Sequence, residues 1–259
     1  MKMRRSRTLE LLRAGKIVMS MKLNTMDARV TEMAAMAGFP CIWVDMEHTP
    51  NDYAVTENQI RAGKCYDTDV LVRVPRGSYS DYIRPLELDA SGIMVPHVMS
   101  VEDAKRVVHM TRYHPIGRRP LDGGNADGKY GNVENYTTAA NENRFIIFQI
   151  EDPEAMEQIE EIAQVPGYDM LFFGPGDFSH SIGHPGQCDH PEVQAGYRRV
   201  AEVARKYGKF AGTVADPWEV PDLIKMGYQF LNLGADVEAL NNSFQKTAKF
   251  ALESGANQL

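Results

Sequence analysis

Acidic, basic and amide side chains gather where the apolar runs of this sequence end. Such groups can move protons, hold a dication or neutralise an oxyanion. The residues at these run ends are Asp45, Glu47 and His48, then Arg73 and Arg76, then His97, then Gln149 and Glu151, and finally Asp177. If the runs are parallel strands of a barrel, their ends share one face, and these side chains meet at one mouth.

Glu151 and Asp177 form the candidate metal site. They stand 177 − 151 = 26 residues apart, one strand-and-helix unit, and neighbouring strands lie about 5 Å apart. Two carboxylates at that separation need a shared proton or a cation between them. Ligands that are all oxygen favour Mg²⁺ or Mn²⁺, with Co²⁺ and Zn²⁺ as alternatives. A salt bridge of the pair to Arg73 or Arg76 is the structural alternative.

The stretch "VDMEH" (44–48) suggests a base with an orienting partner. Side chains alternate along a strand, so Asp45 and Glu47 share one face while His48 begins the loop. An aspartate three residues before a histidine can accept its ring N–H, which fixes the tautomer. We therefore predict that Asp45 orients His48, the alternative being a purely structural histidine. Arg73 would stabilise an oxyanion, or else form a salt bridge with Glu47.

The turn "GPGD" (174–177) is a candidate anion site. Gly174 and Gly176 can present bare backbone N–H groups beside Asp177, where a substrate carboxylate would dock, although a plain turn explains the motif equally well. The sequence has no Gly-x-Ser-x-Gly, HExxH or Walker motif, which argues against the common hydrolase and nucleotide-binding classes. Lys22, at the end of the first run, is the nearest candidate for a Schiff-base lysine.

The elements that must position these residues alternate between strand and helix. Eight apolar runs recur, at 16–22, 41–47, 69–75, 92–98, 145–151, 169–177, 210–214 and 230–236. Stretches with helical spacing lie between them, for example 100–113, 152–164 and 191–209. Runs that are apolar on both faces are typical of parallel strands covered by helices. We predict one (β/α)8 TIM-barrel domain over residues 1–259. A doubly wound sheet is the alternative, but it usually has fewer strands.

Two segments stand outside this alternation. Leu9, Leu11 and Leu12 predict a short N-terminal helix that packs on the barrel. Residues 114–136 are rich in Gly, Asn and Asp, and aperiodic loops of this length are commonly functional or mobile. A surface excursion is the alternative for this loop.

The composition of the 259 residues limits the partners and the compartment. A formal net charge of −7 provides no basic field for nucleic acid. Three widely spaced cysteines, Cys41, Cys65 and Cys188, predict neither disulfides nor a thiolate metal site, and they favour a reducing cytoplasm. No window approaches the apolar length of a membrane span, and the basic start lacks the apolar core of a secretion signal.

Several motifs together resemble the HpcH/HpaI family of metal-dependent pyruvate aldolases. The similar stretches are "VDMEHTPND", "VRVP", "TRYHPIGRR", "FQIEDPEAM" and "FFGPGDFSHSIGHPGQCDHPEV". The resemblance extends from about residue 9 to 250. It implies a (β/α)8 barrel that forms a homo-oligomer, hexamer or trimer, with the last helix exchanged between subunits. It also implies cleavage of 4-hydroxy-2-oxo acids into pyruvate, or a close analogue such as hydroxypyruvate, and an aldehyde.

The resemblance also implies roles for individual residues. Position by position, Glu151 and Asp177 would bind the divalent metal, Arg73 would stabilise the enolate, and His48, oriented by Asp45, would transfer protons. Gln149 and the Gly176–Asp177 backbone would contact the pyruvate end. The sequence departs from the family pattern after Gly117, where Arg118, Arg119 and Pro120 lead into the Gly/Asn-rich loop. We expect this departure to reshape the mouth on the aldehyde side.

Two other functions are compatible with the same barrel. One is carbon–carbon cleavage of a CoA-linked or dicarboxylic substrate, as in the lyase branch of the superfamily. The other is a non-catalytic barrel that only binds oxalate-like acids. The combination of a base, an arginine and two metal ligands argues against a pure binder, which has no need of a proton carrier.

Overall fold

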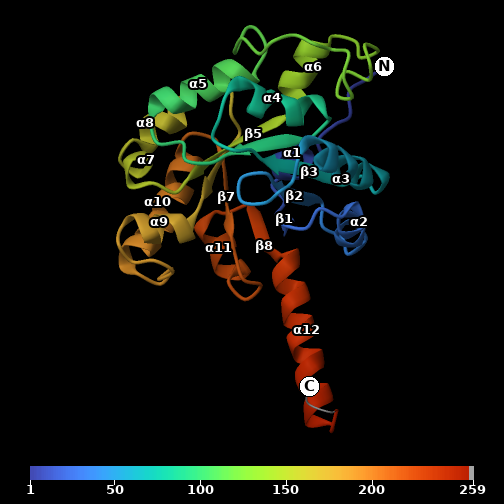
Figure 1. The fold of residues 1–259 in the computed structure, drawn as a ribbon. Coiled ribbons are helices and arrows are strands. Elements are labelled where there is room, and N and C mark those ends of the chain that lie inside the picture. Colours follow the sequence, from blue (N-terminus) through green and yellow to red (C-terminus); the bar gives the residue numbers. More distant parts are fainter. Residues whose placement is uncertain (257–259) are drawn as a thin grey trace.

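Eight parallel strands close into a barrel, each paired with the strands before and after it in the chain, and β8 paired with β1 (Figure 1). We describe residues 1–256 of a computed structural model. The strands are β1 (Val18–Leu23), β2 (Cys41–Asp45), β3 (Asp69–Arg73), β4 (Gly92–Val95), β5 (Phe145–Ile150), β6 (Met170–Phe173), β7 (Phe210–Val214) and β8 (Phe230–Ala235). Seven fall within a predicted run and β1 extends one residue beyond its run, to Leu23, which confirms the (β/α)8 barrel.

The helices that accompany the strands are α1 (Arg7–Arg13), α2 (Ala28–Met36), α3 (Tyr53–Cys65), α4 (Tyr79–Glu87), α5 (Val101–Thr111), α6 (Tyr136–Asn143), α7 (Pro153–Glu157), α8 (Ile159–Gln164), α9 (Pro175–Ser181), α10 (Pro191–Lys206), α11 (Val220–Met226) and α12 (Asp236–Glu253). Most of the helices surround the barrel, while α1 packs at its amino end and α12 extends away from it (Figure 1). The helix predicted over 152–164 is interrupted at Gln158. No helix within residues 1–256 is both long and apolar enough to cross a bilayer.

Strands β2 to β6 are buried along their whole length, as parallel strands under helices should be. Strands β1, β7 and β8 are partly buried, and Met19 of β1 is 43% exposed. Side chains directed outward pack beneath the helices, and those directed inward fill the barrel. The interior cluster includes Trp43 and Phe172, whose rings meet edge-on at 5.6 Å between centroids, together with Phe145 and Phe230. Leu9 and Leu12 of α1 belong to the same cluster, so α1 packs on the barrel as predicted.

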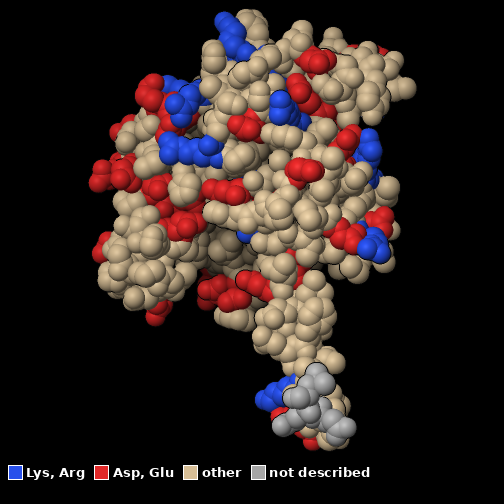
Figure 2. Space-filling model, viewed as in Figure 1, with Lys and Arg blue, Asp and Glu red and all other residues tan. Residues whose placement is uncertain are grey.

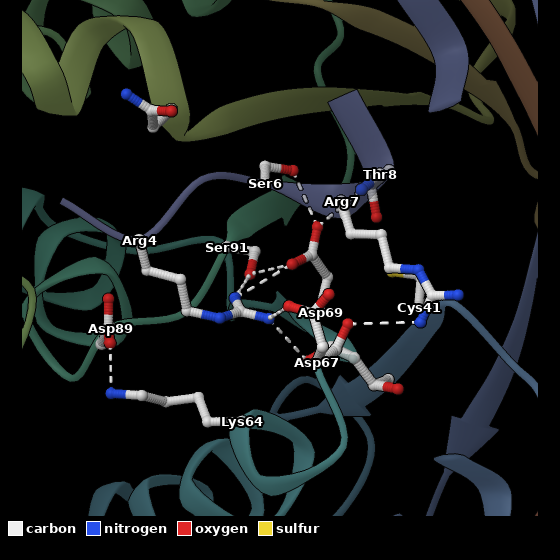
Figure 3. Close-up of polar contacts among 12 residues, drawn as sticks. Arg4, Ser6, Arg7, Thr8, Cys41, Lys64, Asp67, Asp69, Asp89 and Ser91 are labelled. Atoms are coloured by element: carbon white, nitrogen blue, oxygen red, sulfur yellow. Dashed lines mark hydrogen bonds and ion pairs between the residues drawn. The ribbon is translucent and has the colours of Figure 1, made fainter. Parts of the chain in front are cut away.

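A buried polar network joins the N-terminal segment to the amino ends of the strands (Figure 3). The Asp69 carboxylate, fully buried at the start of β3, accepts from Arg4 Nη1 at 3.0 Å and from Ser91 Oγ at 2.8 Å. It also accepts from Ser6 Oγ and from the Thr8 backbone N–H. The N-terminal segment and this buried network therefore close the amino end of the barrel.

The Gly/Asn-rich loop 114–136 lies at that same closed end. Its backbone bonds to the end of α4 through Asp127 N–H and Glu87 O, and to the chain start through Glu134 N–H and Met1 O. The reason is topological: the loop follows a helix and leads into the amino end of β5, whereas the mouth lies at the carboxyl ends of the strands. Our expectation that this loop reshapes the mouth of its own barrel is wrong.

The last helix, α12, leaves the exit of β8 and points away from the barrel (Figure 1). It carries exposed apolar side chains, among them Val237, Leu240, Phe244 and Phe250, with Phe244 67% and Phe250 71% exposed. Such an apolar surface on a helix that packs on little of its own chain indicates a contact with another surface.

Candidate active site

The strand register places two of the predicted site residues, Asp45 and Arg73, side by side. Asp45 ends β2 and Arg73 ends β3, and the two are direct partners in the β2–β3 ladder. Arg73 Nε lies 2.9 Å from Asp45 Oδ1, and Arg73 Nη2 lies 2.6 Å from Oδ2. This two-point contact fixes the plane of the guanidinium, whose Nη1 then reaches Glu47 Oε2 at 3.1 Å. The salt bridge to Glu47 that we considered as an alternative role for Arg73 is therefore present.

Asp45 also holds a second cation. Lys22 Nζ, from β1, lies 2.9 Å from Asp45 Oδ2 and 5.5 Å from the centre of the Trp43 ring. Burial works to raise the pKa of Asp45, but hydrogen bonds and charge from Arg73, and then from Lys22, outweigh it and lower the pKa to about 2. The carboxylate is thus charged at neutral pH, and Lys22 is its ion-pair partner.

The predicted contact between Asp45 and His48 is not formed. The Asp45 carboxylate contacts Arg73, Lys22 and the Glu47 backbone N–H, whereas His48 is 59% exposed with Nε2 3.4 Å from Glu47 Oε2. The cause is the loop after β2: Asn51 Nδ2 donates to Asp45 O at 2.8 Å, which folds the loop back and leaves His48 on its outer side. Glu47, rather than Asp45, is therefore the neighbour of the imidazole.

Glu151 is the buried carboxylate of the mouth. Its Oε1 accepts the His97 backbone N–H at 3.0 Å, and its Oε2 accepts from Gln149 Nε2. A β-carbon at Gly174 would lie 2.7 Å from Oε2, so glycine is required for this close approach. Burial raises the pKa of Glu151 to about 7; the contacts with His97 oppose this, and the charges of Asp177 and Glu47 add to it.

Asp177 is the third residue of α9, whose N-cap is Gly174, so the predicted Gly174–Gly176 turn is the beginning of this helix. Its carboxylate is solvent-exposed, and its charge is one of the causes that raise the Glu151 pKa. The two predicted metal ligands thus share one electrostatic environment. Arg76, the other cation considered for them, is paired with Asp103 Oδ2 at 3.1 Å instead.

His97, predicted at the mouth from its place at the end of an apolar run, belongs to this cluster. Its Nδ1 lies 3.0 Å from Asp152 Oδ2 and 3.6 Å from Glu151 Oε1. Burial works to lower the pKa of His97, but Glu151 and then Asp152 raise it overall. The available signal was its position at the exit of β4, next to the acidic exit of β5.

The donor set fits a hard dication. No group of three or more His, Cys, Asp or Glu side chains is arranged to hold a metal within residues 1–256. However, the negative charge of Asp177 acts on Glu151 and raises its pKa, and the buried Gln149 Oε1 has no hydrogen-bond partner. A cation between oxygen ligands relieves the repulsion between two carboxylates, and oxygen-only sets favour Mg²⁺ or Mn²⁺.

A cavity of about 430 Å³ opens beside this cluster at the exits of β1, β7 and β8. It is lined by Lys22 and Asn24, Pro175, Cys188 and Tyr197, Val214 to Asp216, Glu219, Asn232, and Gly234 to Glu238 apart from Asp236. Two lining residues neighbour the predicted site: Lys22 is paired with Asp45, and Pro175 precedes Gly176 and Asp177 in α9. The residues Asp45, Arg73, Glu151 and Asp177 do not themselves line this cavity.

Comparisons with known proteins agree with this architecture. The profile of the HpcH/HpaI aldolase/citrate lyase family matches residues 19–243. A 2-keto-3-deoxy-L-rhamnonate aldolase of Klebsiella pneumoniae is 32% identical over 247 residues, 94% of this chain and 92% of the relative. The same-named enzyme of Escherichia coli K12 is 32% identical over 251 residues, 96% and 93% of the two chains.

Solved structures show the same fold. The HpcH/HpaI aldolase from Desulfitobacterium hafniense DCB-2 superposes with a TM-score of 0.91 at 31% identity, covering 96% of this chain and 98% of the other. A citrate synthase, SbnG, superposes with a TM-score of 0.88 at 28% identity over 97% and 99% of the two chains. Because the family profile spans most of the chain, and relatives above 30% identity span nearly all of it, this chain belongs to the HpcH/HpaI aldolase/citrate lyase family.

Proposed function

We propose that the protein is a metal-dependent aldolase that cleaves 4-hydroxy-2-oxo acids into pyruvate, or a close analogue such as hydroxypyruvate, and an aldehyde, and that catalyses the reverse addition. The observation that carries this proposal is the shared mouth of Arg73 and Glu151. Burial works to lower the Arg73 pKa, but Asp45, Glu47 and Glu151 raise it overall. A fixed cation thus stands beside a buried carboxylate whose pKa is about 7.

Glu151 and Asp177 would hold the dication, Mg²⁺ or Mn²⁺, with Co²⁺ or Zn²⁺ as alternatives. When bound, the ion polarises the 2-oxo group and takes up charge on the enolate. The free Gln149 Oε1 is an acceptor that suits a cation or a hydroxyl rather than a carboxylate, and the backbone N–H groups of Gly176 and Asp177 would contact the carboxylate end of the substrate, with Gln149 beside them. The 2-keto-3-deoxy sugar acid in the relatives' names is a 2-oxo acid, which supports this substrate class.

Arg73 supplies the electrostatic part of the mechanism. Breaking the C3–C4 bond leaves negative charge on the enolate oxygen, and a donor already fixed in place stabilises it without reorganisation. The two-point contact with Asp45 fixes the Arg73 guanidinium in this way. Asp45 is therefore proposed as the residue that positions Arg73, a role different from the one predicted.

His48 is the proposed proton carrier. Cleavage requires removal of the proton from the C4 hydroxyl, and the C3 carbon later takes up a proton. The His48 side chain is exposed to solvent, and its Nε2 lies 3.4 Å from Glu47 Oε2. His97 is less suited, because Asp152 and Glu151 already engage its ring.

The assembly and the location belong to the same proposal. We propose a homo-oligomer, hexamer or trimer, in which α12 covers its apolar side chains on another subunit. We also propose a cytoplasmic protein without nucleic-acid or membrane partners, on the basis of its negative net charge and unpaired cysteines.

The test is pyruvate release from a 4-hydroxy-2-oxo acid by the purified protein. We expect release to stop in excess EDTA and to resume when Mn²⁺ or Mg²⁺ is added. Turnover that continues undiminished in EDTA contradicts the metal proposal. A Glu151→Ala variant that retains the full rate contradicts the site.

A further inference from the structure

The Asp45 carboxylate, at the end of β2, is surrounded by hydrogen-bond donors. Its Oδ1 accepts from Arg73 Nε at 2.9 Å and from the Glu47 backbone N–H at 3.1 Å. Its Oδ2 accepts from Arg73 Nη2 at 2.6 Å and lies 2.9 Å from Lys22 Nζ. A carboxylate has about four lone-pair positions, so all of them have a partner here. Lys22 therefore occupies the last acceptor position of the carboxylate that holds Arg73.

The charges around Arg73 balance only when Lys22 is included. The Arg73 guanidinium contacts the carboxylates of Asp45 and Glu47, whose side chains are 0% and 12% exposed. One guanidinium against two carboxylates leaves one net negative charge, and the Lys22 ammonium cancels it. Uncompensated negative charge beside an enolate opposes its formation, because Coulomb repulsion is weakly screened in a buried site. Lys22 therefore makes the wall that holds Arg73 neutral.

The surroundings of Lys22 supply no replacement for its charge. Lys22 is the one cation among the residues that line the cavity of about 430 Å³, against the carboxylates of Asp216, Glu219 and Glu238. Figure 2 shows a hollow in this face with acidic side chains gathered over α11 at its rim. Because these neighbours are negative, removal of Lys22 leaves Asp45 in a negative field.

Trp43 holds both cations in place. Arg73 Cζ lies 4.9 Å and Lys22 Nζ lies 5.5 Å from the centre of the Trp43 ring, and a cation is attracted to the face of an indole. The Trp43 side chain is buried in the barrel interior, where its ring meets Phe172 edge-on. Lys22, with 19% of its side chain exposed, is thus held beside Asp45 rather than turned toward solvent.

We propose that Lys22 is a positioning residue for the enolate step: by sharing the charge of Asp45, it leaves the unused N–H groups of Arg73 available to the enolate oxygen. Three atoms of the guanidinium already contact Asp45 and Glu47, and the remaining N–H groups are free for this role. Without Lys22, Asp45 keeps an uncompensated lone pair and attracts Arg73 more strongly. This inference rests on the proposed aldolase function and adds a residue to it.

The first test is exchange of the pyruvate methyl protons into deuterated water by the Mn²⁺-loaded protein, since exchange requires the enolate but no aldehyde. Lys22→Met removes the charge at similar side-chain length. We expect kcat for exchange to fall about tenfold while KM for pyruvate changes less than about twofold, because the lost interaction acts on charge that develops during the step. An unchanged kcat overturns the proposal.

Lys22→Arg restores the charge and should recover at least about half of the exchange rate. A rate as low as that of Lys22→Met contradicts an electrostatic role. This variant keeps a cation beside Asp45, so it also remains informative if the stability of Lys22→Met is too low for assay.

A double-variant cycle separates positioning from a direct contact between Lys22 and the substrate. In Asp45→Asn the carboxylate through which Lys22 acts is absent. Adding Lys22→Met to it should therefore lower kcat less than about twofold further, because the two changes act through one contact. Losses that multiply would show that Lys22 acts independently of Asp45, and this outcome overturns the positioning role.

A second readout needs no turnover. Oxalate resembles the enolate in its planar, anionic form, and its affinity for the Mn²⁺-loaded protein can be measured by calorimetry. We expect Lys22→Met to weaken oxalate about tenfold and pyruvate less than about twofold, since only interactions stronger with the enolate affect the step. Equal weakening of the two ligands would mean that Lys22 only maintains the shape of the mouth, and it overturns the proposal.

Lys64→Met is the matched control. Lys64 pairs with the buried Asp89, which is shared with Arg144 as Asp45 is shared with Arg73, but at the amino end of the barrel. Both variants leave a buried carboxylate with one cation fewer and should lose stability by similar amounts. Lys64→Met should keep the exchange rate and the oxalate affinity within about twofold. Equal functional losses in the two variants would reduce the role of Lys22 to stability and overturn the proposal.

The wild-type protein separates this inference from the function beneath it. Wild-type exchange that depends on Mn²⁺, together with unchanged kcat and oxalate affinity in Lys22→Met, contradicts the role of Lys22 and leaves the aldolase proposal standing. No exchange and no pyruvate release by the wild-type protein contradicts the aldolase proposal, and this inference with it.

Discussion

Asp45 is the residue on which the electrostatics of the mouth depend. Buried at the end of β2, it balances two cations, Arg73 and Lys22, and it orients the first of them through two hydrogen bonds. Removing one partner of a buried ion pair leaves an uncompensated charge, which costs more than the pair contributes. Asp45 therefore affects both the stability of the barrel and the reactivity of its mouth.

The lowered pKa of Asp45 predicts a loss of stability in acid. Because the folded pKa is about 2, below the usual 3.8, the ionised form stabilises the fold above pH 4 and loses this effect as the pH falls toward 2. The full contribution is about 2 kcal/mol, of which about 1 kcal/mol is lost at pH 3. The difference in unfolding free energy between wild type and Asp45→Asn should thus narrow by that amount between pH 5.5 and pH 3, measured in denaturant titrations. A constant difference would contradict the assignment.

Arg73→Lys tests the guanidinium geometry at constant charge. Lysine cannot make the two-point contact with Asp45 and reach Glu47 at the same time, so the cation is no longer fixed toward the enolate. We expect kcat/KM for pyruvate release to fall about 100-fold, within the range for loss of one fixed donor to an oxyanion. Arg76→Lys, at the exposed pair with Asp103, is the matched control and should stay within about twofold. Equal activities of the two variants would remove Arg73 from the mechanism.

At the residue scale, strand position was more predictable than side-chain partners. The positions of Arg73, Glu151 and Asp177 followed from the ends of apolar runs, because parallel strands share a polarity. The partner of Asp45 was not predicted. Arg73, its neighbour on the adjacent strand β3, contacts it in place of His48, three residues further along the chain. The partner of His97 did not follow either, because its contact with Asp152 joins the segments that follow β4 and β5.

At the scale of elements, the alternation of runs and helices predicted all eight strands. Each run was apolar on both faces, and that pattern has few explanations other than a covered parallel strand. The pattern did not predict which surface α12 packs against. Its amphipathic spacing is the same whether its apolar side chains cover its own barrel or another chain.

The exposed side chains of α12 predict an interface between copies of this chain. We expect light scattering after gel filtration to give a multiple of the 29.0 kDa chain mass. Phe244→Glu with Phe250→Glu should shift the protein toward the monomer, because burying two charges in an apolar interface is unfavourable. The control Asn242→Glu with Gln245→Glu places the same charges at exposed polar positions of the same helix. A monomeric wild-type protein would contradict the proposed assembly.

At the scale of the whole molecule, the two ends of the barrel carry different kinds of charged groups. The mouth concentrates charges whose pKa values are shifted by one another, as is common where chemistry is done. The opposite end concentrates buried ion pairs within the chain, such as Asp69 with Arg4 and Asp127 with Arg119. Loop 114–136 was predicted to reshape the mouth because the sequence departs from the family pattern after Gly117, whereas its place between a helix and the next strand puts it at the opposite end of the barrel.

This division predicts that Asp69→Asn damages stability without damaging catalysis. The Asp69 carboxylate accepts four hydrogen bonds from Arg4, Ser6, Thr8 and Ser91, and an amide cannot accept them all (Figure 3). We expect the unfolding free energy to fall by about 3 kcal/mol, the usual cost of breaking a buried, charged network.

At a temperature where both proteins are folded, kcat/KM of Asp69→Asn should stay within about twofold of wild type. Asp69 lies at the start of β3, at the end of the barrel opposite the mouth. Asp67→Asn is the matched control, since Asp67 is 83% exposed and lies 3.9 Å from the same Arg4. It should cost under about 0.5 kcal/mol. A large loss of kcat/KM in folded Asp69→Asn would show that the structural end also sets the geometry of the mouth.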